Sequence, residues 1–301
     1  MRIIKEIRKN YMLYLMLVPV MVYFYLFHYR PMWGIQIAFK DFNVFKGVKD
    51  SPWVGLMYFK QFFQSYYFGR LLKNTVLLSL YNLVFTFIAP IILALQLNAV
   101  RNKYARSTFQ TISYLPHFIS LVVVAGMILV FLEPTGVVNR LLLHLGIIDS
   151  PIIFMMEPEW YRTIYVASGV WQTIGWNSIV YLAALAGIDP QLYEAAVIDG
   201  AGRFKKLIYI TLPSLMPTIV ILFLLNVGRL FSIGAEKTIL LYNPVLYETA
   251  DIISSFVYRR GILQADYSFS AAVGLFNSLI NFALLLSFNR LSKRYTETSL
   301  W

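Results

Sequence analysis

Aromatic and amide side chains gather inside stretches of this chain that are otherwise apolar. The clearest group shares one face of a predicted helix: Trp171, Gln172, Trp176 and Asn177. Comparable candidates in other apolar stretches are Tyr81, Asn82, Asn226 and Asn277. Such side chains can stack on the flat face of a ligand ring and exchange hydrogen bonds with hydroxyl groups. We predict that they line a polar pathway; the alternative is that they bond neighbouring helices to one another.

Covalent and metal chemistry find little support in the sequence. The chain has no Cys, and His28, His117 and His144 are too far apart to form a metal-ligand motif. Acidic residues such as Glu133 lie at the ends of apolar stretches, whereas a proton-coupled carrier needs them inside. No Gly-x-x-x-x-Gly-Lys-Ser/Thr segment is present. We therefore predict no catalytic residue, no metal and no cofactor on this chain, which disfavours a membrane enzyme.

A polar segment between two apolar stretches, residues 189–213, has a distinctive order of residues. Asp189 is a good N-cap and Pro190 suits the first helical position, so a short helix should begin here. Gly200 stands where this helix would end in a left-handed residue, and a second short helix should follow. The small alanines at its centre would let another protein approach closely, and Glu194 offers a charged contact.

The composition indicates that all of these residues belong to an integral membrane protein. Of 301 residues, 58% are hydrophobic and only 14% are charged, whereas soluble domains carry about 25% charged residues. Six stretches reach the length of about 20 residues that crosses a bilayer. They are Tyr11–Tyr29, Asn74–Leu97, Thr108–Leu132, Arg162–Gly187, Pro213–Ile233 and Ser268–Asn289. The predicted fold is an all-α integral membrane protein with six transmembrane helices.

The net charge of +11 is explained by topology rather than by nucleic acid. Four basic clusters fall on the same side of the predicted spans, namely residues 2–9, 101–106, 203–206 and 290–294. The positive-inside rule then places both termini in the cytoplasm of a multi-pass plasma-membrane protein. On the opposite side, residues 246–264 have the spacing of an amphipathic helix lying at the outer membrane surface.

The segment after the fourth predicted span resembles a family signature. Its pattern is Glu194-Ala195-Ala196-x-x-Asp199-Gly200-Ala201, followed by Leu212 and Pro213. This order is similar to the EAA motif of permease subunits in bacterial ABC importers. The resemblance extends over about Asn74–Asn289 as the MetI-like transmembrane fold, with one extra N-terminal span as in maltose-type permeases. The stretch from Tyr242 to Gly261 is similar to the polysaccharide-type (LplB-like) branch.

The resemblance implies a function and a set of partners. The chain would be a permease subunit that imports an oligosaccharide or complex glycan by alternating access. Residues 189–213 would dock on a separate ATPase dimer, which binds ATP and Mg²⁺ on the cytoplasmic side. A second permease subunit, usually a different one, and an extracellular sugar-binding protein would complete the complex in membrane lipid. Because the motif is shared across substrates, a permease for an amino acid or peptide is the alternative.

The same resemblance implies how the chain is organised. Residues 1–73 would form the N-terminal cytoplasmic tail, the first transmembrane helix and an extracellular loop. Residues 74–290 would form the MetI-like transmembrane domain, and residues 291–301 a cytoplasmic tail.

Overall fold

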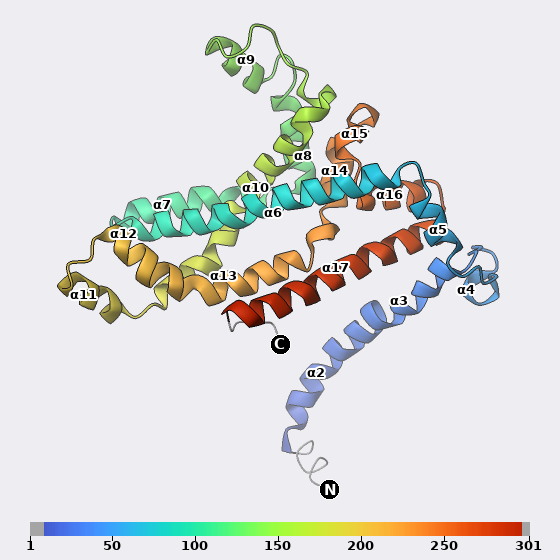
Figure 1. The fold of residues 1–301 in the computed structure, drawn as a ribbon, viewed down its shortest axis with the longest axis horizontal. Coiled ribbons are helices and arrows are strands. Elements are labelled where there is room, and N and C mark those ends of the chain that lie inside the picture. Colours follow the sequence, from blue (N-terminus) through green and yellow to red (C-terminus); the bar gives the residue numbers. More distant parts are fainter. Residues whose placement is uncertain (1–8, 297–301) are drawn as a thin grey trace. The chain divides into compact units, whose positions relative to one another are not determined.

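The computed structural model describes residues 9–296, and within that range every regular element is a helix. Figure 1 shows these helices in the order of the sequence, and the contacts between residues divide the chain into two units. The smaller unit contains residues 9–65 and Val257–Phe276, and the larger unit contains Tyr66–Phe256 and residues 277–296.

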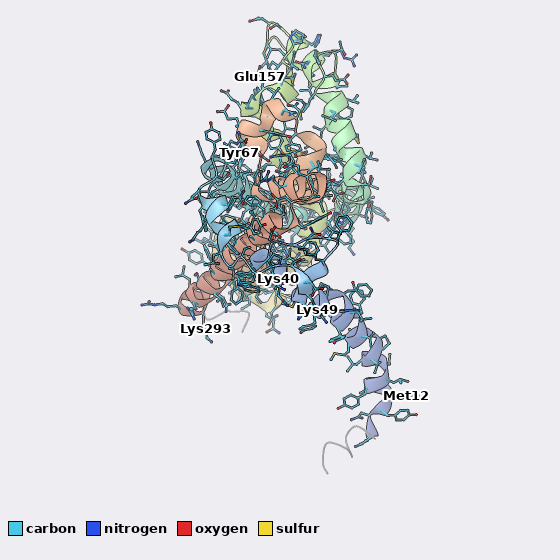
Figure 2. The ribbon with its side chains drawn as sticks, turned by 90° about the vertical axis from the view of Figure 1, so that its right-hand side faces the viewer. Met12, Lys40, Lys49, Tyr67, Glu157 and Lys293 are labelled. Atoms are coloured by element: carbon cyan, nitrogen blue, oxygen red, sulfur yellow. The ribbon has the colours of Figure 1, made fainter. Side chains whose placement is uncertain are left out.

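The smaller unit begins with a helical run from Tyr11 to Phe39. It consists of α2 (Tyr11–Phe24), a wide π turn (Tyr25–Tyr29), α3 (Arg30–Met32) and a 3-10 turn (Trp33–Phe39). None of the α2 residues is buried, and Figure 2 shows Met12 projecting from this helix. A helix that is apolar all round and exposed is typical of a membrane span.

The loop after this helix folds onto the beginning of α17 (Tyr267–Thr296). It contains α4 (Gly47–Asp50) and α5 (Met57–Phe63). The ammonium group of Lys40 donates to the carbonyl oxygen of Lys49 at 3.1 Å, and the two residues are labelled in Figure 2. The Ser268 hydroxyl donates to the carbonyl oxygen of Lys40 at 2.7 Å. The same hydroxyl accepts from Phe42 N at 2.9 Å, so Ser268 holds the loop to the helix.

Long helices form the larger unit. α6 (Phe68–Ala99) packs along α10 (Pro158–Ala186), and α13 (Leu212–Val227) also contacts both. Lipid is as apolar as these side chains, so packing contacts and hydrogen bonds must supply the association. One apolar core, containing Leu97 and Leu182, lies where α6, α10 and α13 meet.

The third predicted span is broken rather than straight. It consists of α7 (Lys103–Tyr114), a 3-10 turn (Leu115–Phe118) and α8 (Leu121–Phe131), with a bend of 98°. Pro116 ends the first helix, and the Ser120 hydroxyl caps the second by accepting from Val123 N at 3.4 Å. The bend lies beside α10, where a Cβ on Gly175 would fall 2.0 Å from the Ser113 carbonyl oxygen. Glycine is therefore needed for α7 and α10 to approach so closely.

Four described helical segments are long and apolar enough to cross a membrane, or five if the bent pair forms one span. The four are Tyr11–Phe39, Phe68–Ala99, Arg203–Val227 and Tyr267–Arg294. The predicted fourth span coincides with α10. This helix is long enough to cross a membrane, but its mean hydropathy is lower than that of the four segments. Its polar positions, Gln172 and Asn177 among them, lower the average.

Shorter helices link these segments. They are α9 (Val137–His144) and a 3-10 turn (Phe154–Met156) before α10, then a 3-10 turn (Leu230–Ser232), α14 (Ala235–Leu241), a 3-10 turn (Pro244–Leu246), α15 (Tyr247–Ala250), α16 (Ile253–Tyr258) and a π turn (Arg259–Leu263). The stretch predicted to lie on the membrane surface differs from expectation, because Asp251, Ile252 and Ser255 are fully buried. Their polar groups are paired inside the protein, so this part of the stretch is packed in the interior and does not lie on the membrane surface.

Candidate functional site

The segment that resembles the EAA motif forms a capped, exposed helix. α11 (Pro190–Ile198) has no buried residue, and the Asp189 carboxylate accepts from Gln191 N at 2.9 Å. The helix ends at Gly200, whose φ is +71°, and Gly200 N donates to the Val197 carbonyl oxygen at 3.0 Å. Both the predicted N-cap and the predicted left-handed glycine are confirmed, so local sequence alone determines this helix.

The motif residues before the second helix are turned to the surface. Glu194, Ala195, Asp199 and Gly200 are exposed, while Ala196 and Ala201 are half-buried. No other helix in the described part of the chain packs extensively along α11. The segment therefore presents one carboxylate and several small side chains to whatever docks on it.

The last two motif residues lie within a continuous helix. α12 (Arg203–Lys206), a π turn (Leu207–Thr211) and α13 run without a break, and Leu212 and Pro213 begin α13. The Pro213 ring would crowd the carbonyl four residues earlier, and the wide π turn relieves that contact. The Tyr193 hydroxyl lies 2.9 Å from the Thr211 hydroxyl. α11 is thus tied to the beginning of α13.

A small polar cavity of about 230 Å³ lies between α6 and the end of α13. Two predicted pathway residues, Asn82 and Asn226, line it. Its other polar side chains are Ser79, Thr86, Tyr165, Arg229 and Ser232. The Ser79 hydroxyl is buried and has no hydrogen-bond partner, so it is available to a molecule inside the cavity.

A buried cation lies behind the wall of this polar cavity. Lys237 is 6% exposed, and its ammonium group donates to the Tyr165 carbonyl oxygen at 2.7 Å and lies 4.6 Å from the centre of that ring. A Cβ on Gly169 would be 3.3 Å from the Lys237 ammonium and 3.8 Å from the Asn82 side-chain oxygen. No carboxylate lines the cavity in the described part of the chain, so its local charge is positive.

The four candidates on α10 do not converge on this cavity. Trp171 lines a separate apolar hollow of about 380 Å³ together with Tyr81. Gln172 donates to the Ile119 carbonyl oxygen at 3.0 Å, and Trp176 stacks on His117 with ring centres 4.5 Å apart. Gln172 and Trp176 therefore support the bend between α7 and α8, whereas Asn177 is exposed.

Asn277 has a supporting position beside the polar cavity. Its amide donates to the Phe231 carbonyl oxygen at 2.9 Å, and the Asn281 oxygen accepts from Phe231 N at 2.8 Å. These bonds fix the turn that carries Ser232 at the cavity wall.

Several cavity residues were not predicted as pathway residues, although the sequence holds a signal for some of them. Ser79 and Thr86 share one face of α6 with the predicted residue Asn82, because the three are spaced i, i+3, i+7. Arg229 and Lys237 carry no such periodic signal, because short turns position them. No metal-ligating group of His and acidic residues occurs among the described residues.

Comparison with known proteins extends over nearly the whole chain. Residues 86–297 match the family described as the binding-protein-dependent transport system inner membrane component. The chain is 42% identical to protein LplB of Bacillus subtilis (strain 168), over 98% of this chain and 92% of that protein. It is also 42% identical to the polygalacturonan/rhamnogalacturonan transport system permease protein YteP of that organism, over 99% of this chain and 92% of that protein.

Solved structures agree with these relatives. A chain of a bacterial ABC transporter involved in the import of the acidic polysaccharide alginate matches with a TM-score of 0.91 and 44% identity, over 98% of this chain and 100% of that chain. Together with the exposed EAA-like segment, the matches confirm the predicted MetI-like resemblance. The chain belongs to the family of binding-protein-dependent transport system inner membrane components.

Proposed function

We propose that this chain is a permease subunit of an ABC importer that carries an acidic oligosaccharide into the cell. The polar cavity between α6 and α13 carries the proposal, because its amides and hydroxyls accompany cationic Arg229 and no carboxylate. Sugar hydroxyls need such donors and acceptors, and a guanidinium pairs with a uronate carboxylate. Lys237, buried behind Tyr165, adds a second positive charge.

The relatives support an acidic glycan over an amino acid or peptide. One is a permease for polygalacturonan and rhamnogalacturonan, and a matching solved complex holds a periplasmic protein bound to an alginate pentasaccharide. Polygalacturonan and alginate are polyanions, in keeping with a cavity of positive local charge.

The proposed complex assigns the energy source to other subunits. A second permease subunit completes the pathway, an ATPase dimer binds and hydrolyses ATP with Mg²⁺, and an extracellular binding protein delivers the glycan. α11 docks on the ATPase through Glu194 and its neighbouring alanines. The helix from Arg203 to Val227 then transmits the movement to Asn226 and Arg229 at the cavity.

The proposed topology has six spans and both termini in the cytoplasm. It counts the bent α7–α8 pair and α10 as spans beside the four apolar segments. Residues 1–73, 74–290 and 291–301 then form the N-terminal region, the MetI-like domain and a cytoplasmic tail.

Transport by the reconstituted complex tests the substrate. We expect uptake of uronate oligosaccharides to exceed uptake of neutral ones of equal length. Arg229→Gln should raise KM for the uronate several-fold and leave a neutral substrate unchanged, while Arg140→Gln on α9 is the control for the same loss of charge. Equal effects of both variants, or a preference for an amino acid, would overturn the proposal.

The absence of Cys makes a direct topology test possible. Single Cys substitutions at Lys103 and Lys293 should react with a membrane-impermeant thiol reagent only from the cytoplasmic side. Cys at Phe45 or Leu145, both exposed, should react only from the outside. Labelling of Lys103→Cys from the outside contradicts the proposed orientation.

A further inference from the structure

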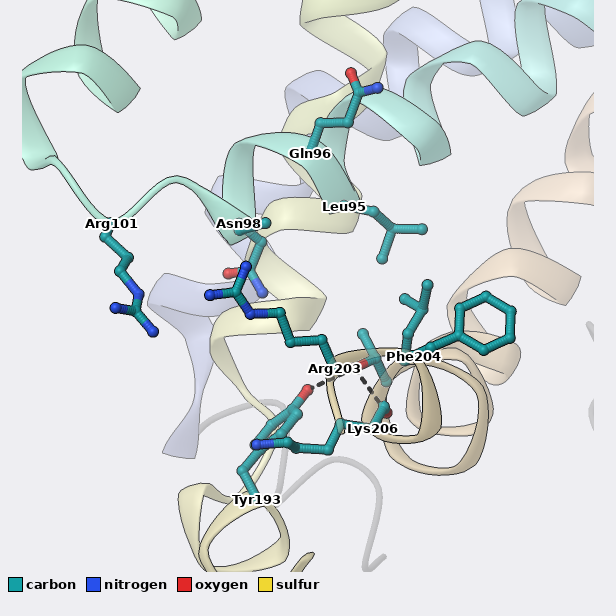
Figure 3. Close-up of a pocket in the computed structure, with 11 residues that line it drawn as sticks. Leu95, Gln96, Asn98, Arg101, Tyr193, Arg203, Phe204 and Lys206 are labelled. Atoms are coloured by element: carbon teal, nitrogen blue, oxygen red, sulfur yellow. Dashed lines mark hydrogen bonds between the residues drawn. The ribbon is translucent and has the colours of Figure 1, made fainter. Parts of the chain in front are cut away.

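A larger cavity, of about 730 Å³, is partly lined by residues 189–213, which are proposed to dock on the ATPase and are named the coupling segment. It is an open cavity lined by the carboxyl end of α6, the link to α7, the side chain of Tyr193, α12 and the π turn after it (Figure 3). It is separate from the polar cavity, with which it shares no residue.

The lining of this cavity is amphipathic. Arg101, Arg203 and Lys206 lie on one side of it in Figure 3, whereas Leu95 and Phe204 lie on the other. No carboxylate lines it, and none of the three cations belongs to an ion pair within residues 9–296. An occupant that fits both sides has an anionic head and an apolar tail.

We infer that this cavity binds an anionic phospholipid of the inner leaflet, with the headgroup phosphate on the cations and an acyl chain along Leu95 and Phe204. Guanidinium groups pair with phosphate oxygens in a bidentate manner, and basic residues near the cytoplasmic leaflet are attracted to its anionic lipids. A free phosphate would leave the apolar wall uncovered. The inference rests on the proposed function insofar as it places α11 in the cytoplasm.

The position of the site gives the lipid a mechanical role. Arg101 belongs to the link between α6 and α7. Arg203 and Lys206 belong to α12, which follows the turn at Gly200. A phosphate shared by these cations joins the link to α12. The Tyr193–Thr211 contact joins α11 to the continuous helix that begins with α12, so the lipid steadies the segment that docks on the ATPase.

Lipid binding to the whole complex tests the inference. The complex is placed in phosphatidylcholine nanodiscs containing a small fraction of labelled phosphatidylglycerol, and the label retained per complex is measured without ATP or glycan. The variant R101Q/R203Q/K206Q should retain at least about fivefold less label than the wild type. The control R290Q/K293Q/R294Q, which removes the same charge from the end of α17, should match the wild type.

Three results would overturn the assignment of a lipid to this cavity. Equal label retention by both triple variants and the wild type overturns it, as does an equal loss in both. Displacement of the label by millimolar inorganic phosphate also overturns it, because the cavity would then take a soluble anion. If the pocket variant does not assemble, Arg101→Gln alone is used, and it should lower retention about twofold.

Failure of this inference is distinguishable from failure of the proposed function. Label retention needs no transport, and the uptake assays contain no labelled lipid. Preferred uronate uptake without specific lipid retention overturns the lipid site alone, whereas specific retention in a complex that imports another solute overturns the substrate alone.

Discussion

Polar side chains are buried and hydrogen-bonded near the amino end of α6, whereas those beside its carboxyl end are exposed. At the amino end, Asn74 is buried and donates to the carbonyl oxygens of Glu248 and Asp251 at 2.9 and 3.1 Å. Its own oxygen accepts from Arg162 at 2.8 Å. At the carboxyl end, beside α11, Arg101 and Arg203 are exposed and form no ion pair among the described residues.

This difference separates a region that stabilises the fold from a region whose side chains are available to other subunits. The Asp251 end joins α6, α10 and the α15–α16 stretch through buried bonds that are costly to break. The α11 end leaves its charges and small side chains for other molecules. Changes at the first end should therefore alter stability, and changes at the second should alter transport by complexes that are still folded.

The largest effect is expected at the Asp251 end. Asp251→Ala removes the partner of Arg70, 3.6 Å away, and one acceptor of the Ser255 hydroxyl. Loss of one member of a buried pair costs about 3 kcal/mol, at the low end of the usual range because Arg70 is 31% exposed. Thermal unfolding of the purified complex measures it. Asp266→Ala breaks a closer but half-exposed pair, 3.1 Å from Arg260, and should cost less than about 1 kcal/mol.

At the α11 end, Gly200→Val should reduce uptake about tenfold or more without loss of assembled complex. A β-branched residue is strained at a φ of +71°, so the turn between α11 and α12 is distorted. Gly202→Ala is the matched control, because Gly202 has a φ of −66° and open space around it. Normal uptake by Gly200→Val contradicts a role of Gly200 in coupling. A drop in complex yield large enough to account for the reduced uptake contradicts it as well.

Glu194→Arg probes the same end by charge instead of by backbone. Glu194 is exposed, and a reversed charge should weaken docking of the ATPase about fivefold while the unfolding temperature stays unchanged. Copurification of the ATPase measures the docking. Undiminished copurification and uptake would show that α11 does not contact the ATPase through this face.

A smaller effect than at Asp251 is expected at the bend between α7 and α8. Trp176→Ala removes a stacked contact with His117 and should cost at least about 1 kcal/mol of stability, because such pairs contribute about 0.5–1.5 kcal/mol beyond the area that they bury. Trp176→Phe keeps a ring and should recover most of that loss. If Trp176→Ala instead changes glycan dependence in complexes of unchanged stability, Trp176 belongs to the pathway.

The sequence predicted best what local chemistry determines. The N-cap at Asp189 and the left-handed Gly200 follow from side-chain and backbone preferences, and the structure has both. Long apolar runs likewise located the helices that begin at Tyr11 and Phe68. These features do not depend on distant parts of the chain.

Tertiary placement was harder to predict. The run from Thr108 to Leu132 is apolar on both sides of its bend, so hydropathy does not report the break at Pro116. Trp171 and Trp176 do not share a helical face after all, because five residues at about 100° each separate them by about 140°. One lines an apolar hollow and the other stacks on His117. Which neighbour a side chain meets depends on helix crossings that a single sequence does not encode locally.

The exposure of α11 has a consequence for how such transporters diversify. Its ends are determined by Asp189 and Gly200 and none of its residues is buried, so its surface can change without repacking the bundle. Exchanging residues 191–198 for those of another permease, with Tyr193 kept because it contacts Thr211, should transplant the choice of ATPase and leave the glycan pathway as it was. The partner and the cargo can then evolve independently within one chain.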